Sequence, residues 1–211
     1  IYPPEKEALG AVALEVQMQR YDAILFDMGY TLVYFEPSSA RLIQESLQSL
    51  GIDRPVDEIE RAMDLVWQRY YQEGAGTTFP ATEAYDRESE LRLGRELLAQ
   101  LGVKASEAQV AAYRQALGAR FDQPGVVRPF NETADVLTDL REQGYRMGIV
   151  SNWGWNLRER VAQAGLDGFF ETVWASAYAG CHKPHPVIFQ QTLARMEATP
   201  ERALYVGDSY E

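Results

Sequence analysis

Four short stretches of this sequence carry side chains that together could bind and transfer a phosphoryl group. Asp27 follows the apolar residues "ILF", and Asp208 follows "LYVG" near the end of the sequence. Ser151 with Asn152 and, further on, Lys183 supply a hydroxyl, an amide and an ammonium group. Carboxylates suit a hard divalent cation such as Mg²⁺, while a hydroxyl and a lysine can contact phosphate oxygens. These residue types therefore indicate cation-assisted phosphoryl chemistry, provided that the fold brings them together.

The elements that would position these groups are buried parallel strands, because the apolar runs before them are continuous rather than alternating. Helical patterns occur around the last three of these strands, which predicts an α/β sheet with right-handed crossovers. The carboxyl ends of such strands meet at one edge of the sheet, where ligands bind. The predicted strands are Ala23–Phe26, Met147–Val150, Thr172–Ala175 and Ala203–Val206. The predicted helices are Asn131–Glu142, Asn156–Leu166 with a capping-box spacing at Asn156 and Glu159, and Pro186–Met196 with proline at its first position.

The stretch from about residue 37 to residue 122 interrupts this alternation with helical patterns alone. Ser106 and Gln109 have the spacing of a capping box at the start of one helix. An apolar stripe with helical spacing marks another, and we interpret its Trp and Tyr as bundle core and only secondarily as substrate contact. That stripe consists of Ile59, Ala62, Met63, Val66, Trp67 and Tyr70. The sequence therefore predicts a helical bundle inserted directly after the first strand.

Composition limits the classes of partner and the compartment. The 211 residues, 46% of them hydrophobic, can bury one good core or one core with a smaller satellite. The formal net charge of -11 argues against nucleic acid and against an anionic membrane surface. Cys181 is the single cysteine, so an intrachain disulfide is impossible, which suits a reducing cytosol. With neither a membrane-spanning apolar run nor a secretion signal in view, we expect a cytoplasmic protein.

Four motifs resemble those of the haloacid dehalogenase (HAD) superfamily of hydrolases. They are "DMGYTL", "IVSN", "HKPHPVIF" and "LYVGDS", in the family's order over residues 21 to 211. The resemblance implies a Rossmann-like core over residues 21–36 and 123–211 and a type 1 helical cap over residues 37–122. Residues 1–20 would form an N-terminal extension. Because the sequence stops at Glu211, before a further carboxylate and a last strand that the family usually has, we expect part of the core to be absent from it.

The family resemblance also implies roles for individual residues. Asp27 would be the nucleophile that forms an aspartyl-phosphate, and Asp27, Asp208 and the backbone carbonyl of Gly29 would hold Mg²⁺. Ser151 would hydrogen-bond the transferring phosphoryl group, and Lys183 would neutralise it together with the nucleophile. The implied substrate-binding set also contains Asn152 and Thr31, the latter by ordering the loop after the first strand.

Gly29 is the main departure from the family pattern. The family's phosphatases have a second aspartate there, which serves as general acid for the leaving group and then as general base for water. Gly29 cannot transfer a proton, and Tyr30 is a poor substitute because an unperturbed phenol titrates near 10. The sequence therefore predicts substrates whose leaving group needs little protonation.

These features favour a Mg²⁺-dependent phosphatase of a small phosphorylated metabolite, and other functions stay open. A haloacid dehalogenase would need an arginine for the substrate carboxylate, for which Arg41 is the candidate. A phosphonate-cleaving relative would use a lysine of the cap, where Lys104 is the only one. A non-catalytic binding protein with the same fold is a third alternative. We expect residues 74–85 to form the contact loop for substrate, whereas the sequence indicates no oligomeric state.

Overall fold

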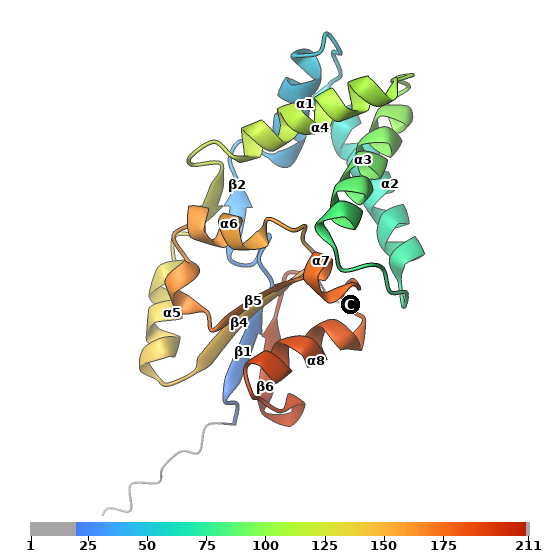
Figure 1. The fold of residues 1–211 in the computed structure, drawn as a ribbon. Coiled ribbons are helices and arrows are strands. Elements are labelled where there is room, and N and C mark those ends of the chain that lie inside the picture. Colours follow the sequence, from blue (N-terminus) through green and yellow to red (C-terminus); the bar gives the residue numbers. More distant parts are fainter. Residues whose placement is uncertain (1–19, 210–211) are drawn as a thin grey trace, which may run out of the picture.

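The computed structural model describes residues 20–209, and its centre is a parallel sheet. Strands β1 (Ala23–Phe26), β4 (Arg146–Ser151), β5 (Thr172–Ala175) and β6 (Ala203–Val206) pair in the order β5-β4-β1-β6. All of these pairings are parallel. Helices cover both faces of the sheet (Figure 1), so the predicted α/β class is confirmed. Each predicted strand is present, and β4 is one residue longer at each end than predicted.

Both faces of the sheet are buried, which explains why the strands are continuously apolar. Ile24 and Phe26 pack in one cluster with side chains of α5 (Thr133–Glu142) and α6 (Leu157–Gln163). Leu25 points the other way and packs in a second cluster with side chains of α8 (Pro186–Arg195). A short helix, α7 (Ser176–Ala179), follows β5, and 3-10 turns occur at Asp167–Phe169 and Pro200–Arg202. Pro186 occupies the first helical position of α8, as predicted.

Helices α1 to α4 pack into a separate cluster of buried side chains, and we call residues 39–121 the helical unit. Its helices are α1 (Ser39–Gln48), α2 (Val56–Gly74), α3 (Glu83–Gln100) and α4 (Glu107–Phe121). Their shared core includes Leu47, Ile59, Leu98, Val110 and Tyr113, each at most 1% exposed. Figure 1 shows this unit beyond the carboxyl ends of the sheet strands. None of the helices in residues 20–209 is long and apolar enough to cross a membrane.

The chain enters and leaves the helical unit through a two-stranded antiparallel ribbon that was not predicted. Strand β2 (Val33–Phe35) pairs with β3 (Val127–Pro129), and the pairing continues as the Glu36 N–H donates to the Val126 carbonyl at 2.9 Å. Strands of three residues are too short to show a period in the sequence. Both connections between the helical unit and the sheet therefore lie side by side.

Two local predictions about helix ends have different outcomes. The capping box at Ser106 and Gln109 is confirmed. The one at Asn156 and Glu159 is wrong, because Asn156 makes no side-chain capping bond and its Oδ1 accepts instead from the Trp153 indole N–H at 3.1 Å. Residues 1–19 of the predicted N-terminal extension lie outside the described residues.

Candidate active site

The strand register places the predicted site residues at one edge of the sheet. Phe26 pairs with Ile149 of β4 on one side and with Val206 of β6 on the other. The Asp27 N–H then donates to the Val206 carbonyl at 2.8 Å. Ser151 is therefore two residues past the pairing partner of Phe26 on β4, and Asp208 is two residues past it on β6. The nucleophile candidate lies between the hydroxyl and the second carboxylate.

Asp27 and Lys183 form a nearly buried ion pair at this edge. Lys183 Nζ is 2.8 Å from Asp27 Oδ2, and the two side chains are only 7% and 15% exposed, respectively. Asp27 Oδ1 accepts from the Met28 N–H at 2.7 Å, and Lys183 Nζ also donates to the Tyr205 hydroxyl at 2.7 Å. A buried carboxylate is costly unless it is paired and hydrogen-bonded. These contacts compensate for the burial of the Asp27 carboxylate.

Asn152 holds the backbone that carries Lys183. Its Oδ1 accepts from the Lys183 N–H at 2.7 Å, and its Nδ2 donates to the Lys183 carbonyl at 3.3 Å. Both ends of the amide are thus engaged in positioning the lysine. Ser151, next to it, is 2% exposed. The hydroxyl of Thr31 is buried and has no hydrogen-bond partner within residues 20–209.

Gly29 leaves space that the ring of Trp153 partly occupies. An ideal Cβ at Gly29 would lie 3.6 Å from Trp153 Cζ3, an ordinary van der Waals separation. Its φ is outside the positive region that favours glycine, whereas the next residue, Tyr30, has φ 55. The backbone conformation at position 29 therefore does not require glycine, and a side chain there would contact the neighbouring indole.

A cavity of about 1020 Å³ lies between this sheet edge and the helical unit. Asp27, Gly29, Ser151, Lys183 and Asp208 all line it, and so does Asn152, whereas Thr31 is not among the described residues that do. The helical unit contributes the opposite wall. Four residues of the expected contact loop also line the cavity, namely Phe79, Pro80, Thr82 and Tyr85.

Trp67 and Tyr70 face this cavity, so the interpretation of their stripe needs correction. Ile59 and Val66 are buried in the helical core as expected. Trp67, however, is 40% exposed, and Trp67, Tyr70 and Met63 line the cavity. The apolar stripe on α2 therefore serves two surfaces, the core of the helical unit and the wall of the cavity.

The helical unit contacts the sheet edge at two places that the sequence did not indicate. At the first, the Phe79 N–H donates to the Gly180 carbonyl at 2.8 Å, and His182 lies against the rings of Tyr70 and Phe79 at centroid distances of 5.0 and 4.9 Å. Burial, and secondarily the Arg92 guanidinium, lowers the pKa of His182 from 6.5 to about 4. His182 is therefore a neutral contact between the two parts of the protein.

At the second place, Asp86 of α3 contacts the loop after β4. Its Oδ2 accepts from the Trp155 N–H at 2.8 Å, and an ideal Cβ at Gly154 would lie 3.1 Å from the same oxygen. Burial raises the pKa of the Asp86 carboxyl, although the hydrogen bond from Trp155 opposes this. Asp86 lies outside the four motifs and His182 begins one of them, but no sequence pattern indicated that either residue joins the helical unit to the sheet edge.

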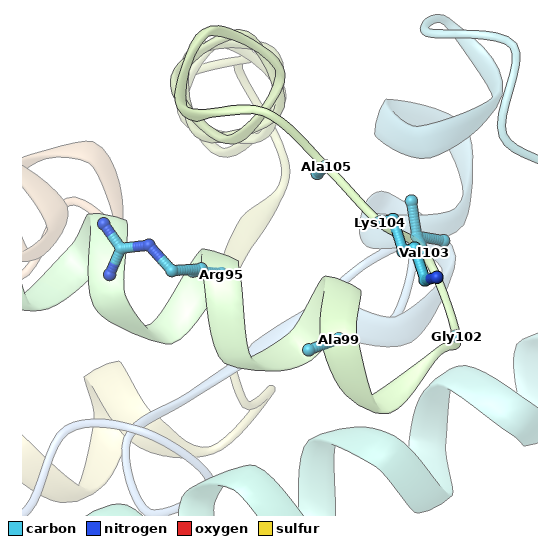
Figure 2. Close-up of a pocket in the computed structure, with 6 residues that line it drawn as sticks. All are labelled: Arg95, Ala99, Gly102, Val103, Lys104 and Ala105. Carbon is cyan, nitrogen blue, oxygen red and sulfur yellow. The ribbon is translucent and has the colours of Figure 1, made fainter.

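The candidates for the alternative activities lie away from the cavity. Arg41 on α1 is hydrogen-bonded to Gln44 at 2.6 Å and lies 3.5 Å from Glu45. Lys104 lines a smaller pocket at the turn from α3 to α4, together with Arg95 (Figure 2). Neither Arg41 nor Lys104 is among the described residues that line the large cavity.

The donor set at the sheet edge fits a hard divalent cation. Asp27 and Asp208 supply carboxylate oxygens and Gly29 a backbone carbonyl, all on the same cavity. Each carboxylate oxygen of Asp27 has one hydrogen-bond donor and retains a lone pair. Within residues 20–209, no three His, Cys, Asp or Glu side chains cluster as a metal site, so Cys181, His182 and His185 do not form one.

Comparison with known proteins gives concordant matches. A family model described as a haloacid dehalogenase-like hydrolase matches residues 21–211. A glyceraldehyde 3-phosphate phosphatase of Methanopyrus kandleri is 30% identical over 188 residues, which cover 88% of this chain and 75% of that protein. The protein of the same name from Methanothermobacter thermautotrophicus is 38% identical over 87 residues, or 40% of this chain, and the match spans only 38% of the relative's length.

Among solved structures, the magnesium-bound crystal form of the Bacillus subtilis protein YfnB, described as a HAD hydrolase, superposes with a TM-score of 0.66. It is 23% identical, and the match covers 90% of this chain and 81% of that chain. At this level of identity the likeness shows the fold.

Proposed function

This chain belongs to the haloacid dehalogenase-like hydrolases, and we propose that it hydrolyses phosphomonoesters of small metabolites with Mg²⁺, through a phosphorylated Asp27. The names of the two archaeal relatives, both phosphatases, support the class of reaction. We further propose that residues 37–122 act as a cap over a core of residues 21–36 and 123–211. The cap would close over the substrate, as lids do in many enzymes.

The observation that carries this proposal is the nearly buried Asp27–Lys183 ion pair that lines the cavity. An isolated carboxylate would repel a phosphate dianion, but the ammonium 2.8 Å away neutralises Asp27. Lys183 would then attract the phosphoryl group while Asp27 acts as the nucleophile. The Ser151 hydroxyl, which lines the same cavity, would donate to a phosphoryl oxygen.

In the first step, an oxygen of Asp27 would bond to phosphorus while the bond from phosphorus to the alcohol oxygen breaks. The departing oxygen keeps the electron pair and takes a proton from solvent. In the second step, water would attack the phosphorus of phosphorylated Asp27, lose a proton and release inorganic phosphate, which regenerates the carboxylate. This covalent route divides one difficult displacement into two easier ones.

Mg²⁺, held by Asp27, Asp208 and the Gly29 carbonyl when bound, would add positive charge for the phosphate oxygens. The Bacillus subtilis structure with magnesium supports this cofactor. Asn152 would act as a positioning residue for Lys183, because both of its amide groups bind that residue's backbone.

Gly29 would restrict the enzyme to good leaving groups. No carboxyl group stands at this position to protonate the departing oxygen, and a Cβ there would be in van der Waals contact with the Trp153 ring. The carboxylate of an acyl phosphate or the phenoxide of an aryl phosphate can depart without a general acid, whereas an alkoxide departs with difficulty.

The positions of Arg41 and Lys104 disfavour these two residues as the candidates for the alternative hydrolase activities. Dehalogenation needs a cation for the substrate carboxylate in the cavity, and phosphonate cleavage needs a reactive lysine there. Arg41 is engaged with its own helix, and Lys104 lies in the separate pocket of Figure 2.

A parallel assay of three substrate classes tests the proposal. Acetyl phosphate, phenyl phosphate and a 2-haloacid would be supplied separately, with Mg²⁺ and with EDTA. We expect Mg²⁺-dependent release of inorganic phosphate and no release of halide. Halide release without phosphate release, or no turnover in any arm with a folded protein, would contradict the proposed function.

A further inference from the structure

The wall of the cavity opposite Asp27 is largely aromatic. Trp67 stacks on Tyr71 with ring planes 20° apart, and Phe79 stacks on Tyr85 with planes 10° apart. All four side chains line the cavity, and Trp67 keeps 40% of its surface exposed. Tyr30, which is 56% exposed, adds an aromatic side chain from the sheet side. Exposed aromatic faces that line a concave site are suited to stacking on a flat ligand.

The cations that line the cavity are already neutralised by carboxylates. Lys183 is paired with Asp27 at 2.8 Å. The guanidinium of Arg114 is 3.2 Å from Glu90. Arg160, buried to 7% exposure, is 2.6 Å from Asp122, which balances its charge from outside the cavity.

Two further carboxylates line the half of the cavity that the helical unit provides, and they have no such partner. Asp64 on α2 and Asp86 on α3 form no ion pair with any Lys or Arg in the part of the chain that the structure describes. Asp86 accepts a hydrogen bond from the Trp155 N–H. Arg114, which is already paired with Glu90, is the cation that acts on Asp86, so an anionic group on the alcohol portion of a substrate would meet more negative than positive charge in this half of the cavity.

We propose that the alcohol portion of the substrate is aromatic and carries no negative charge. This inference rests on the proposed phosphatase function and names its substrate class: monoesters of neutral or cationic aryl alcohols. It excludes bisphosphates and phosphorylated carboxylic acids. The class also agrees with Gly29, because a phenoxide departs without the proton that the missing acid would have supplied.

Matched aryl phosphates test the two halves of the inference on the wild-type protein. The effect of a larger flat ring is measured by comparing kcat/KM for 2-naphthyl phosphate with kcat/KM for phenyl phosphate. The leaving groups of these two esters are of similar acidity. We expect a preference for the naphthyl ester of about 2- to 12-fold, which corresponds to one added stacking contact. For charge, 4-carboxyphenyl phosphate is compared with its neutral analogue, 4-carbamoylphenyl phosphate, and we expect at least a tenfold lower kcat/KM for the carboxylate.

Variants test whether the side chains of the cavity wall cause these substrate preferences. Trp67→Ala should reduce the preference for the naphthyl ester. Leu65→Ala is the matched control, because Leu65 is 46% exposed on the same helix and does not line the cavity. The double variant Asp64→Asn, Asp86→Asn should bring kcat/KM for the carboxyl ester closer to kcat/KM for the carbamoyl ester. Any intrinsic difference between those two leaving groups cancels when the ratio is compared with that of wild type.

Acetyl phosphate distinguishes failure of this inference from failure of the proposed function. If acetyl phosphate is hydrolysed but the naphthyl ester has no advantage over phenyl phosphate, the aromatic assignment is wrong. If the carboxylated ester is turned over as well as the carbamoyl ester, the charge assignment is wrong. If no phosphate is released from acetyl phosphate or any aryl phosphate, the proposed phosphatase function itself fails.

Discussion

Restoring a carboxyl group at Gly29 is the sharpest test of how the protein manages without a general acid. The structure allows the substitution Gly29→Asp, since the backbone φ is not positive there and a Cβ would be 3.6 Å from Trp153. We therefore expect the variant to fold, without the cost of about 1 kcal/mol that a side chain incurs in the left-handed region.

The expected gain depends on the leaving group. General acid–base catalysis is typically worth about 10²–10⁴-fold in rate. At about 1.4 kcal/mol for each factor of ten, this corresponds to about 3–5 kcal/mol of the barrier. An alkyl phosphate should receive most of that gain, because an alkoxide leaves poorly without a proton. Acetyl phosphate should gain much less in its first step, since its leaving group is already a weak base.

The assay measures kcat/KM, which reports the step that releases the leaving group, for an alkyl phosphate, phenyl phosphate and acetyl phosphate with wild type, Gly29→Asp and Gly29→Asn. The asparagine variant has the same shape as the aspartate and cannot transfer a proton, so it controls for packing against Trp153. A rise confined to the aspartate variant and largest for the alkyl ester supports the reasoning. If wild type already hydrolyses alkyl phosphates as fast as aryl phosphates and the aspartate adds nothing, another residue supplies the proton and the reasoning is refuted.

Three further predictions concern the residues around the ion pair. Asp27→Asn should abolish phosphate release while the circular dichroism spectrum stays close to that of wild type, and undiminished turnover would remove Asp27 as nucleophile. Asn152→Ala deletes two hydrogen bonds to the Lys183 backbone, so unfolding in urea should show a loss of about 1–3 kcal/mol together with a lower kcat; unchanged stability and kcat would contradict its positioning role. The pKa of His182 is lowered to about 4, so the unfolded chain binds a proton near pH 6.5 before the folded protein does, and stability should fall as the pH drops from about 6.5 towards 4. His182→Phe should flatten that part of the stability profile, and an equally steep profile in the variant would assign the effect to other groups.

The sheet and its functional edge were predictable because local signals for both are strong. Strands β1, β5 and β6 begin and end where the continuous apolar runs of the sequence do. The rule that ligands bind at the carboxyl ends of parallel strands then places Asp27, Ser151 and Asp208 on one cavity before any coordinates are known. The helix starts at Ser106 and Pro186 likewise follow from local chemistry.

Features that depend on contacts between distant segments were not predictable in this way. Asn156 has the sequence of a helix cap, but the indole of Trp153 competes for its side-chain oxygen. Trp67 lies on an apolar helical stripe, and its periodicity cannot show whether that face meets a core or a cavity. Asp86 and His182 join the site only because the helical unit docks on the loops after β4 and α7.

The β2–β3 ribbon has a consequence for how the protein could be re-engineered. The helical unit is inserted between strands β2 and β3, which pair with each other. A hydrogen bond from the Glu36 N–H to the Val126 carbonyl joins the two ends of the insertion. An insertion whose two ends already meet adds little loop-closure entropy to the core, whatever its length. The ribbon is therefore a suitable place at which to join the inserted helices of a relative to this core. A chimaera joined within the ribbon should keep the ion pair of the sheet edge, because Asp27 and Lys183 both lie outside the exchanged stretch, and its activity would show how far substrate choice follows the inserted helices.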